Sequence, residues 1–382
     1  MQRLWGTTES FNRKLTNSWR IALYSLISCL GLFFGGTLSL WAQAAPAAES
    51  KPATAAAGTS GAAARPDLSS SELRPRIDEK WSTPSLEGSV LPMGDPLVGA
   101  IDRHNPIFTR ELVRVQWRSA DPVDLYIIKP NGVKKPPVVL YLYSYPFETD
   151  RFLKDDFAAF LTKAGFAAVG FPSALTSTRY RGNRPMKEWF VSELQESLAT
   201  TAHDVQMILN YLATRGDLDM DRVGMFGDGS GAAIAILAAA VDPRIKTLDL
   251  LDPWGDWPDW IKKSPLIPEK ERPDYLKPEF LEKVAPLDPV KWFPQLKTQK
   301  VRLQVVKTVA VTPAEAMLKI EAAAPANVKI VHFDTVSEFK ASTAGGTGFD
   351  WIKEQLQPGS TRSQQAAGAA GESPAASARQ LQ

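Results

Sequence analysis

The sequence predicts an α/β fold in which a mostly parallel sheet is flanked by helices. Three observations support it. Strand-like and helical patterns alternate along residues 110–356, and two strand patterns come first. A glycine-rich turn at 227–231 then joins a buried strand to a helix of small residues. Repeated strand–helix units place their strands parallel, with helices on both faces of the sheet.

The first elements come in a definite order. Alternating apolar and polar residues at 109–117 and 123–130 predict an antiparallel pair of strands. The continuous apolar run at 136–146 predicts a strand buried on both faces. Helical spacing at 152–165 ends at Gly165, a typical C-terminal stop. Further strands are expected at 166–172, 222–227, 245–252, 301–307 and 327–333, and further helices at 191–215, 313–324 and 348–356.

A Trp- and Pro-rich insert, residues 253–298, follows the sixth predicted strand. Its size and place suit a lid over the carboxyl ends of the strands. Trp254, Trp257 and Trp260 lie three residues apart and would form one stripe on a helical turn. The stripe could line an apolar or sugar-binding pocket, contact a membrane interface, or anchor the insert on the sheet. Anchoring is favoured, because buried aromatic residues need no ligand to explain them.

The amino terminus carries a targeting signal. A basic stretch ending at Arg20 precedes an apolar run at 21–40, and Ala42-Gln43-Ala44 forms a cleavage site. Residues 1–44 are therefore predicted to be a signal peptide that exports the chain to the periplasm or the medium. The apolar run is also long enough to span a bilayer, so 21–40 could instead remain as a membrane anchor.

Low-complexity segments flank the folded part. Residues 45–74 and 357–382 are rich in Ala, Pro, Ser, Thr and Gly and predict a disordered linker and tail around a domain at 75–356. Cys29, the only cysteine, lies in the apolar run of the leader, so the exported chain would contain no disulfide.

The charge pattern excludes several classes of function. The formal net charge is +2, but residues 1–44 hold four basic residues against one acidic residue, so the rest is close to neutral. No basic stripe is left for nucleic acid, and membrane contact is expected only through the N-terminal segment. Three scattered histidines make no ligand cluster, so neither a metal site nor a cofactor is expected.

The stretch RVGMFGDGSGAAIAILAAAVDPRIK, residues 222–246, resembles the nucleophile turn of the α/β-hydrolase superfamily. The resemblance covers about 110–356 and is nearest to the dienelactone-hydrolase and acyl-peptidase-like branch. It implies ester or amide hydrolase ancestry and a Ser-His-Asp triad. The superfamily motif is G-x-S-x-G, with small residues two before and two after the nucleophile, because the turn is tight.

Glycine stands where this motif has its nucleophile. Numbering on Gly229 places Gly227 and Gly231 at the two small positions, whereas numbering on Ser230 places Asp228 there. Gly229 is therefore predicted at the tip of the turn, with no side chain to attack a substrate. Ser230 either points away from the site or caps the following helix.

The resemblance places the catalytic base in a loop after the last strand. His104 precedes the sheet and His203 lies within a helix, so His332, on the last strand, is the candidate base. The segment beyond it, 335–348, is taken as a loop and contains no histidine.

The acid of the triad is also displaced. After the strand at 301–307 only Glu315 is available, already in a helix. Asp252, which ends the preceding strand, is the candidate acid, and Asp256 is an alternative. Helix capping or a hydrogen bond to the insert accounts equally well for Asp252.

A vestigial pocket is expected around the turn. Backbone N–H groups of Ser230 and of Ser144–Tyr145 would form the oxyanion hole, next to Gly229 and Trp254. Such a pocket suits a small ester, amide or carboxylate. A polar loop at 179–190 would hold an acidic substrate at the rim or simply be solvated; its basic residues are Arg179, Arg181, Arg184 and Lys187.

Two functional hypotheses follow. The first is an exported serine-type carboxylic ester or peptide hydrolase that uses the unusual set Ser230, His332 and Asp252. The second is a non-catalytic protein that binds a ligand or partner in the vestigial pocket.

Overall fold

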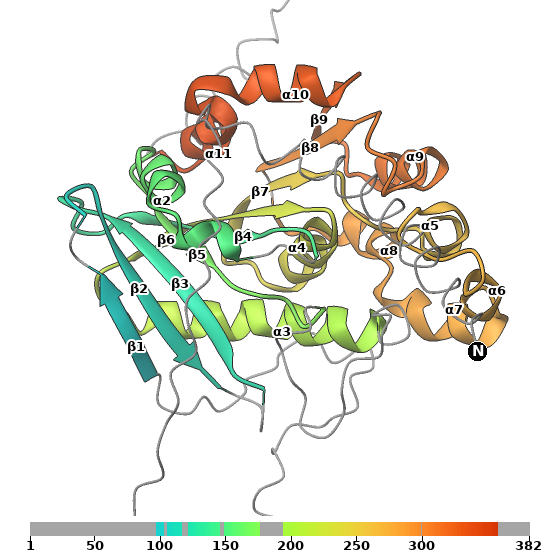
Figure 1. Cartoon of the computed structure of the whole chain (residues 1–382), viewed down its shortest axis with the longest axis horizontal. Coiled ribbons are helices and arrows are strands. Elements are labelled where there is room, and N and C mark those ends of the chain that lie inside the picture. The colour runs from blue at the N-terminus through green and yellow to red at the C-terminus, as the bar shows by residue number, and fades with distance from the viewer. Residues whose placement is uncertain are drawn as a thin grey trace, which may run out of the picture.

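The computed structural model describes residues 97–102, 105–116, 121–145, 149–175, 194–298 and 300–357. They form one nine-stranded sheet with helices on both faces (Figure 1). The predicted leader, linker and tail beyond 357 lie outside these residues, as do His104 and the polar loop at 179–190. Within the described part, no helix is long and apolar enough to cross a membrane.

The sheet has the order β1-β2-β3-β5-β4-β6-β7-β8-β9. The pairs β1–β2, β2–β3 and β3–β5 are antiparallel, and all others are parallel. The strands are β1 Leu97–Asp102, β2 Phe108–Val115, β3 Val123–Pro130, β4 Pro137–Leu142, β5 Ala167–Gly170, β6 Asp219–Asp228, β7 Ile245–Leu251, β8 Lys300–Val306 and β9 Lys329–Phe333. The predicted α/β architecture is confirmed.

Strand β1 was not predicted. It is short and contains glycine, and its pairing with β2 is interrupted by a register shift between Val98 and Ala100. Because of this extra strand, the Trp- and Pro-rich insert follows the seventh strand of the sheet rather than the sixth.

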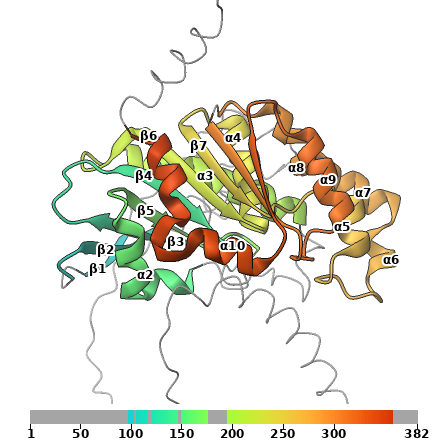
Figure 2. The ribbon, with the colours of Figure 1, turned by 90° about the horizontal axis from the view of Figure 1, so that it is seen from above.

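Helices cover the sheet in two layers (Figures 1 and 2). One layer contains α3, α4, the insert and α9, and the other contains α2, α10 and α11. The helices are α2 Asp155–Thr162, α3 Leu194–Ala213, α4 Ser230–Val241, α5 Trp257–Lys263, α6 Arg272–Tyr275, α7 Pro278–Val284, α8 Pro289–Trp292, α9 Ala314–Ala323, α10 Val336–Thr343 and α11 Asp350–Gln355, with short 3₁₀ helices η2 Asp150–Leu153, η4 Ala285–Leu287, η5 Phe293–Gln295 and η6 Ala344–Phe349.

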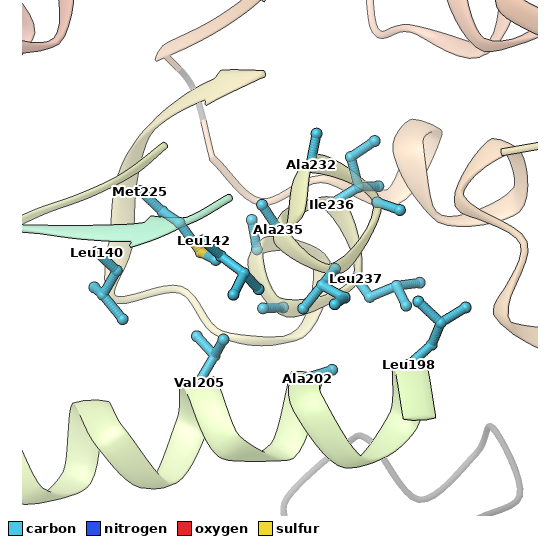
Figure 3. Packing of buried hydrophobic residues seen from close by; sticks show 14 of the residues in the cluster. Leu140, Leu142, Leu198, Ala202, Val205, Met225, Ala232, Ala235, Ile236 and Leu237 are labelled. Carbon is cyan, nitrogen blue, oxygen red and sulfur yellow. The ribbon is translucent and has the colours of Figure 1, made fainter. Parts of the chain in front are cut away.

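Helix α4 lies at the centre of the larger core. Every one of its residues is buried, as expected for a helix that is apolar on all sides. Its alanines allow close approach to the sheet and to α3, and Figure 3 shows Ala235 on the side of the helix that faces Leu142. This packing fixes the start of α4, and with it the glycine-rich turn, against the end of β6.

The face of the sheet opposite α4, covered by α2, α10 and α11, contains a buried ion pair. Arg302 on β8 donates to both carboxylate oxygens of Asp249 on β7, at 2.9 and 2.6 Å, and Gln304 adds a third donor at 2.9 Å. The guanidinium also lies 4.9 Å from the ring of Trp351 in α11. Asp249 is fully buried, so removing Arg302 alone would leave an uncompensated charge.

The segment after β9 is a helix, so the loop expected there was wrong. Thr335 caps α10 by accepting a hydrogen bond from the N–H of Glu338 at 3.1 Å. Glu338 in turn accepts from the N–H of Asp334 at 2.6 Å. This reciprocal arrangement, Thr followed three residues later by Glu, is a capping signal that the sequence contains.

The insert packs beside α3, α4 and α9. Trp254, Trp257 and Trp260 are at most 1% exposed and belong to the main core. The rings of Trp254 and Trp260 lie 4.7 Å apart, centroid to centroid. The three tryptophans therefore lie where anchors of the insert would lie.

Candidate functional site

The glycine-rich turn connects β6 to α4. Gly229 has φ 55° and ψ −113°, a conformation that side-chain-bearing L-residues rarely adopt. A Cβ on Gly227 would lie 2.6 Å from Cα of Ala232, and one on Gly231 would lie 1.9 Å from the carbonyl oxygen of Leu142. Glycine is thus required two residues before and two after Gly229, which places Gly229 at the tip of the turn.

The space in front of Gly229 is filled. A Cβ there would lie 2.4 Å from Oγ of Ser144 and 3.1 Å from Nε1 of Trp254. The backbone is also held: the N–H of Gly229 donates to the carbonyl of Leu251 at 2.9 Å, and its own carbonyl accepts from the N–H of Trp254 at 3.2 Å. Ser144 and Trp254 therefore occupy the place that a nucleophilic side chain would need.

Ser230 is the first residue of α4 and is fully buried. Its Oγ accepts a hydrogen bond from the backbone N–H of Tyr145 at 2.9 Å. That N–H is one of the donors expected for the oxyanion hole. The donor is therefore already bonded within the protein, and the hydroxyl points to β4 rather than into solvent.

His332 lies in β9, paired with Val305 of β8. Its Nε2 lies 3.1 Å from Oε1 of Glu321, and 43% of its side chain is exposed. Strands β7 and β8 separate β9 from β6, so the lateral distance between the ends is about 14 Å at 4.7–4.9 Å per strand. The structure does not bring His332 and Ser230 together. His203, in α3, is buried.

Asp252 follows β7 and is 8% exposed, with φ 43°. Its Oδ1 accepts from the N–H of Val306, at the end of β8, at 2.8 Å. This bond joins neighbouring strands, rather than capping a helix or holding the insert. Burial raises the pKa of Asp252 well above its usual value, and the charge of Asp228 adds to the shift.

The alternative acids are paired with lysines. Asp256 accepts from Nζ of Lys319 at 2.8 Å, and Glu315 accepts from Nζ of Lys263 at 2.5 Å. Neither carboxylate has a hydrogen bond to a histidine. Within the described ranges, no three His, Cys, Asp or Glu side chains lie close enough to hold a metal ion.

A polar group that sequence reasoning missed lies on the other side of the turn. Asp228 ends β6 on the face covered by α2 and α10, and burial raises its pKa to about 6, with Arg151 opposing the shift. Arg151 lies 3.8 Å over the ring of Tyr143. The sequence did indicate that Asp228 and Asp252 would lie close together, because they end adjacent parallel strands. In the structure Asp228 pairs with Leu251, the residue before Asp252.

Of three comparisons with known proteins, only the one with solved structures gives matches. No family model matches the sequence, and no curated protein matches it either. Solved structures do match. Acetyl xylan esterase 1 from Thermoanaerobacterium sp. JW/SL YS485 aligns with a TM-score of 0.55 and 13% identity over 70% of this chain and 89% of its own.

Two more solved structures align over a similar part of the chain. S-formylglutathione hydrolase from Agrobacterium tumefaciens has a TM-score of 0.52 and 13% identity, covering 68% of this chain and 99% of its own. An acetyl xylan esterase from Paenibacillus sp. R4 has a TM-score of 0.50 and 14% identity, covering 66% and 85%. At this identity the likeness concerns the fold, and the narrower branch stays a prediction. The strand order, the glycine turn and these neighbours together give this chain the α/β-hydrolase fold.

Proposed function

We propose that this protein has kept the scaffold of an ester hydrolase and has lost the serine hydrolase mechanism. The observation that carries the proposal is the filled space at Gly229, where Ser144 and Trp254 occupy the position of the nucleophilic side chain. The three residues of a triad act as a unit. Without the nucleophile, the base has no proton to remove and the acid has no base to orient.

The positions of the other candidate residues support the proposal. A nucleophile needs a base within hydrogen-bond reach, about 3 Å. Ser230 instead bonds to Tyr145, and His332 lies on β9, three strands from β6, where it bonds to Glu321. Asp252 is bonded to the backbone of β8 rather than to a histidine. Ligand binding in the vestigial pocket is disfavoured by the same contact between Ser230 and Tyr145, because it uses one oxyanion donor.

We propose in addition that the protein works outside the cytoplasm, because a leader-like segment at 1–44 precedes the fold. Fractionation of cells expressing the full chain tests this. Protein found only in the cytosol would contradict it.

The mechanism is tested by hydrolysis of p-nitrophenyl acetate and by the mass of the protein after treatment with a fluorophosphonate, which labels nucleophilic serines. We expect neither turnover above buffer nor an adduct, for the parent and for Ser230→Ala alike. Turnover that Ser230→Ala abolishes, while the remote control Ser342→Ala does not, would show a relocated nucleophile and end the proposal.

A second test of the proposal restores a serine at the position of the nucleophile. Gly229→Ser alone places a Cβ against Oγ of Ser144, so it is paired with Ser144→Gly, which removes that contact. Both variants are first checked for a cooperative thermal transition. We expect the double variant to stay inactive because His332, the candidate base, lies on β9, which β7 and β8 separate from β6. Activity comparable to an ordinary esterase would mean that the base is present.

A further inference from the structure

A cavity of about 210 Å³ opens at the amino edge of the sheet, at the opposite ends of the strands from Gly229. It lies near the starts of β4 and β6, at Pro137 and Arg222. The turn after α2, at Gly165 and Phe166, forms one wall, and the end of α11 forms another. None of these residues belongs to the glycine turn or its surroundings.

Three basic side chains line this cavity: Lys135, Arg222 and Lys353. Arg222 donates from Nε to Asp219 at 2.7 Å and from Nη1 to the carbonyl of Leu356 at 3.3 Å. Its Nη2 has no bond to any described residue. Lys135 and Lys353 form no ion pair within the described ranges. Asp219 thus offsets one of three positive charges, and a charge of about +2 remains around one cavity.

The inner wall is apolar. Phe166 is 1% exposed and Leu356 is 4% exposed, and Pro137, the first residue of β4, also lines the cavity. A cavity with cations at its mouth and apolar side chains at its base favours a ligand with a charged head and an apolar body. Its volume is below the roughly 300–1,000 Å³ that hold drug-sized ligands, so the body must be small.

We propose that this cavity binds a small organic phosphate, a phosphate monoester whose body is a single ring or a short chain. A phosphate monoester carries about −1.5 to −2 charges at pH 7, which matches the uncompensated charge of the cavity. Lysine and arginine are the side chains that bind phosphate, and arginine does so through its fork of N–H donors. The free Nη2 of Arg222 and the ammonium groups of Lys135 and Lys353 would hold the head. The site does not depend on whether Gly229 is catalytically silent.

Phenyl phosphate is the probe, titrated by calorimetry into the full-length protein at low salt. We expect saturable binding at millimolar concentrations that weakens as salt is added. Lys135→Gln and Lys353→Gln should each weaken it about tenfold, because a hydrogen bond to a charged group is typically worth about one such factor. Lys262→Gln, an exposed lysine in α5, removes the same charge elsewhere and should have no effect.

Two further ligands test the charged head and the apolar body of the proposed ligand separately. Inorganic phosphate has the head without the ring and should bind more weakly than phenyl phosphate, and phenol has the ring without the charge and should not bind. The absence of saturable phenyl phosphate binding would overturn the proposal. Equal weakening by Lys262→Gln would also overturn it, because attraction would then come from net charge rather than from this cavity. Equal affinity for inorganic phosphate would overturn the assignment of the apolar wall.

Discussion

The two ends of the parallel strands differ in how their polar groups are used. At the carboxyl ends, around Gly229, the space for a side chain is filled by Ser144 and Trp254, and the N–H of Tyr145 is bonded to Ser230. At the amino ends, Lys135 and Lys353 surround an open cavity and have no carboxylate partner among the described residues. In open α/β sheets ligands usually bind at the carboxyl ends. Here the basic side chains without a carboxylate partner among the described residues lie at the other end, and the proposed phosphate site uses them.

The largest effect is expected from tightening the turn at the carboxyl ends. Gly231→Ala places a Cβ 1.9 Å from the carbonyl oxygen of Leu142, a backbone atom that cannot easily move. We expect a loss of more than about 3 kcal/mol in the free energy of unfolding, above the usual 1–3 kcal/mol for overpacking. Urea unfolding measures it.

Gly216→Ala is the matched control, since nothing lies within 4 Å of the added Cβ. We expect it to be neutral or slightly stabilising. If Gly231→Ala were as mild as this control, the close contact of α4 with β4 would not constrain the turn.

The next effect depends on pH. The pKa of Asp228 is raised to about 6 in the folded protein, from an ordinary 3.8, so the native state binds more protons between these values and stability falls as pH rises through them. Asp228→Asn removes this cost. We expect the variant to gain about 1–2 kcal/mol over the parent at pH 8 and nothing at pH 3.5, since one unit is worth about 1.4 kcal/mol and partial exposure screens some of it.

Urea unfolding at the two pH values tests the difference, with Asp274→Asn as control. Asp274 is 72% exposed and pairs with Lys277 on the surface, so its removal should change little at pH 8. A gain for Asp228→Asn that is the same at both pH values would show that ionisation is not the cause.

A smaller effect is expected at Ser230. Ser230→Ala leaves the N–H of Tyr145 without the acceptor it has at 2.9 Å, which should cost about 1 kcal/mol in the free energy of unfolding. Ser342→Ala removes a hydroxyl that donates to a helix carbonyl and should be close to neutral. Thermal and urea unfolding distinguish the two. A neutral Ser230→Ala would mean that this contact does not hold the ends of β4 and β6 together.

The smallest effect is expected at the amino ends. Lys353→Gln removes one of three neighbouring positive charges that have little compensation, so the free energy of unfolding should change by less than about 0.5 kcal/mol. Urea unfolding without added phosphate measures it. A loss above 1 kcal/mol would mean that Lys353 is structural, and the contrast between the two ends would weaken.

Much of the fold could be predicted from the sequence, because long buried strands and α4 have unmistakable patterns. The glycine spacing also located Gly229 correctly at the tip of the turn, since steric limits on Gly227 and Gly231 are local. Strand β1 has neither the apolar and polar alternation of β2 and β3 nor the long apolar run of β4, so its sequence carries little signal. Helix α10 is short and mostly polar, so the capping pair Thr335 and Glu338 is its main mark in the sequence.

The surroundings of the turn could not be predicted. Ser144 and Trp254 fill the space before Gly229. Their positions depend on how the end of β4 and the start of the insert meet in space, and these two segments are more than a hundred residues apart in the sequence. The partner of Ser230 depends in the same way on the backbone of Tyr145. The amino-edge cavity joins Lys135 to Lys353, from the two ends of the domain, and neither residue stands in a motif.

The irregularity in β1 bears on how the molecule behaves at high concentration. An outermost strand offers backbone groups that another chain can pair with, and long regular strands of this kind promote aggregation. In β1 the register with β2 shifts between Val98 and Ala100, after only two residues. A bulge bends a strand and increases its local twist, so β1 is a poor template for the addition of a further strand. The interrupted register therefore disfavours pairing with a second chain at the β1 edge of the described sheet.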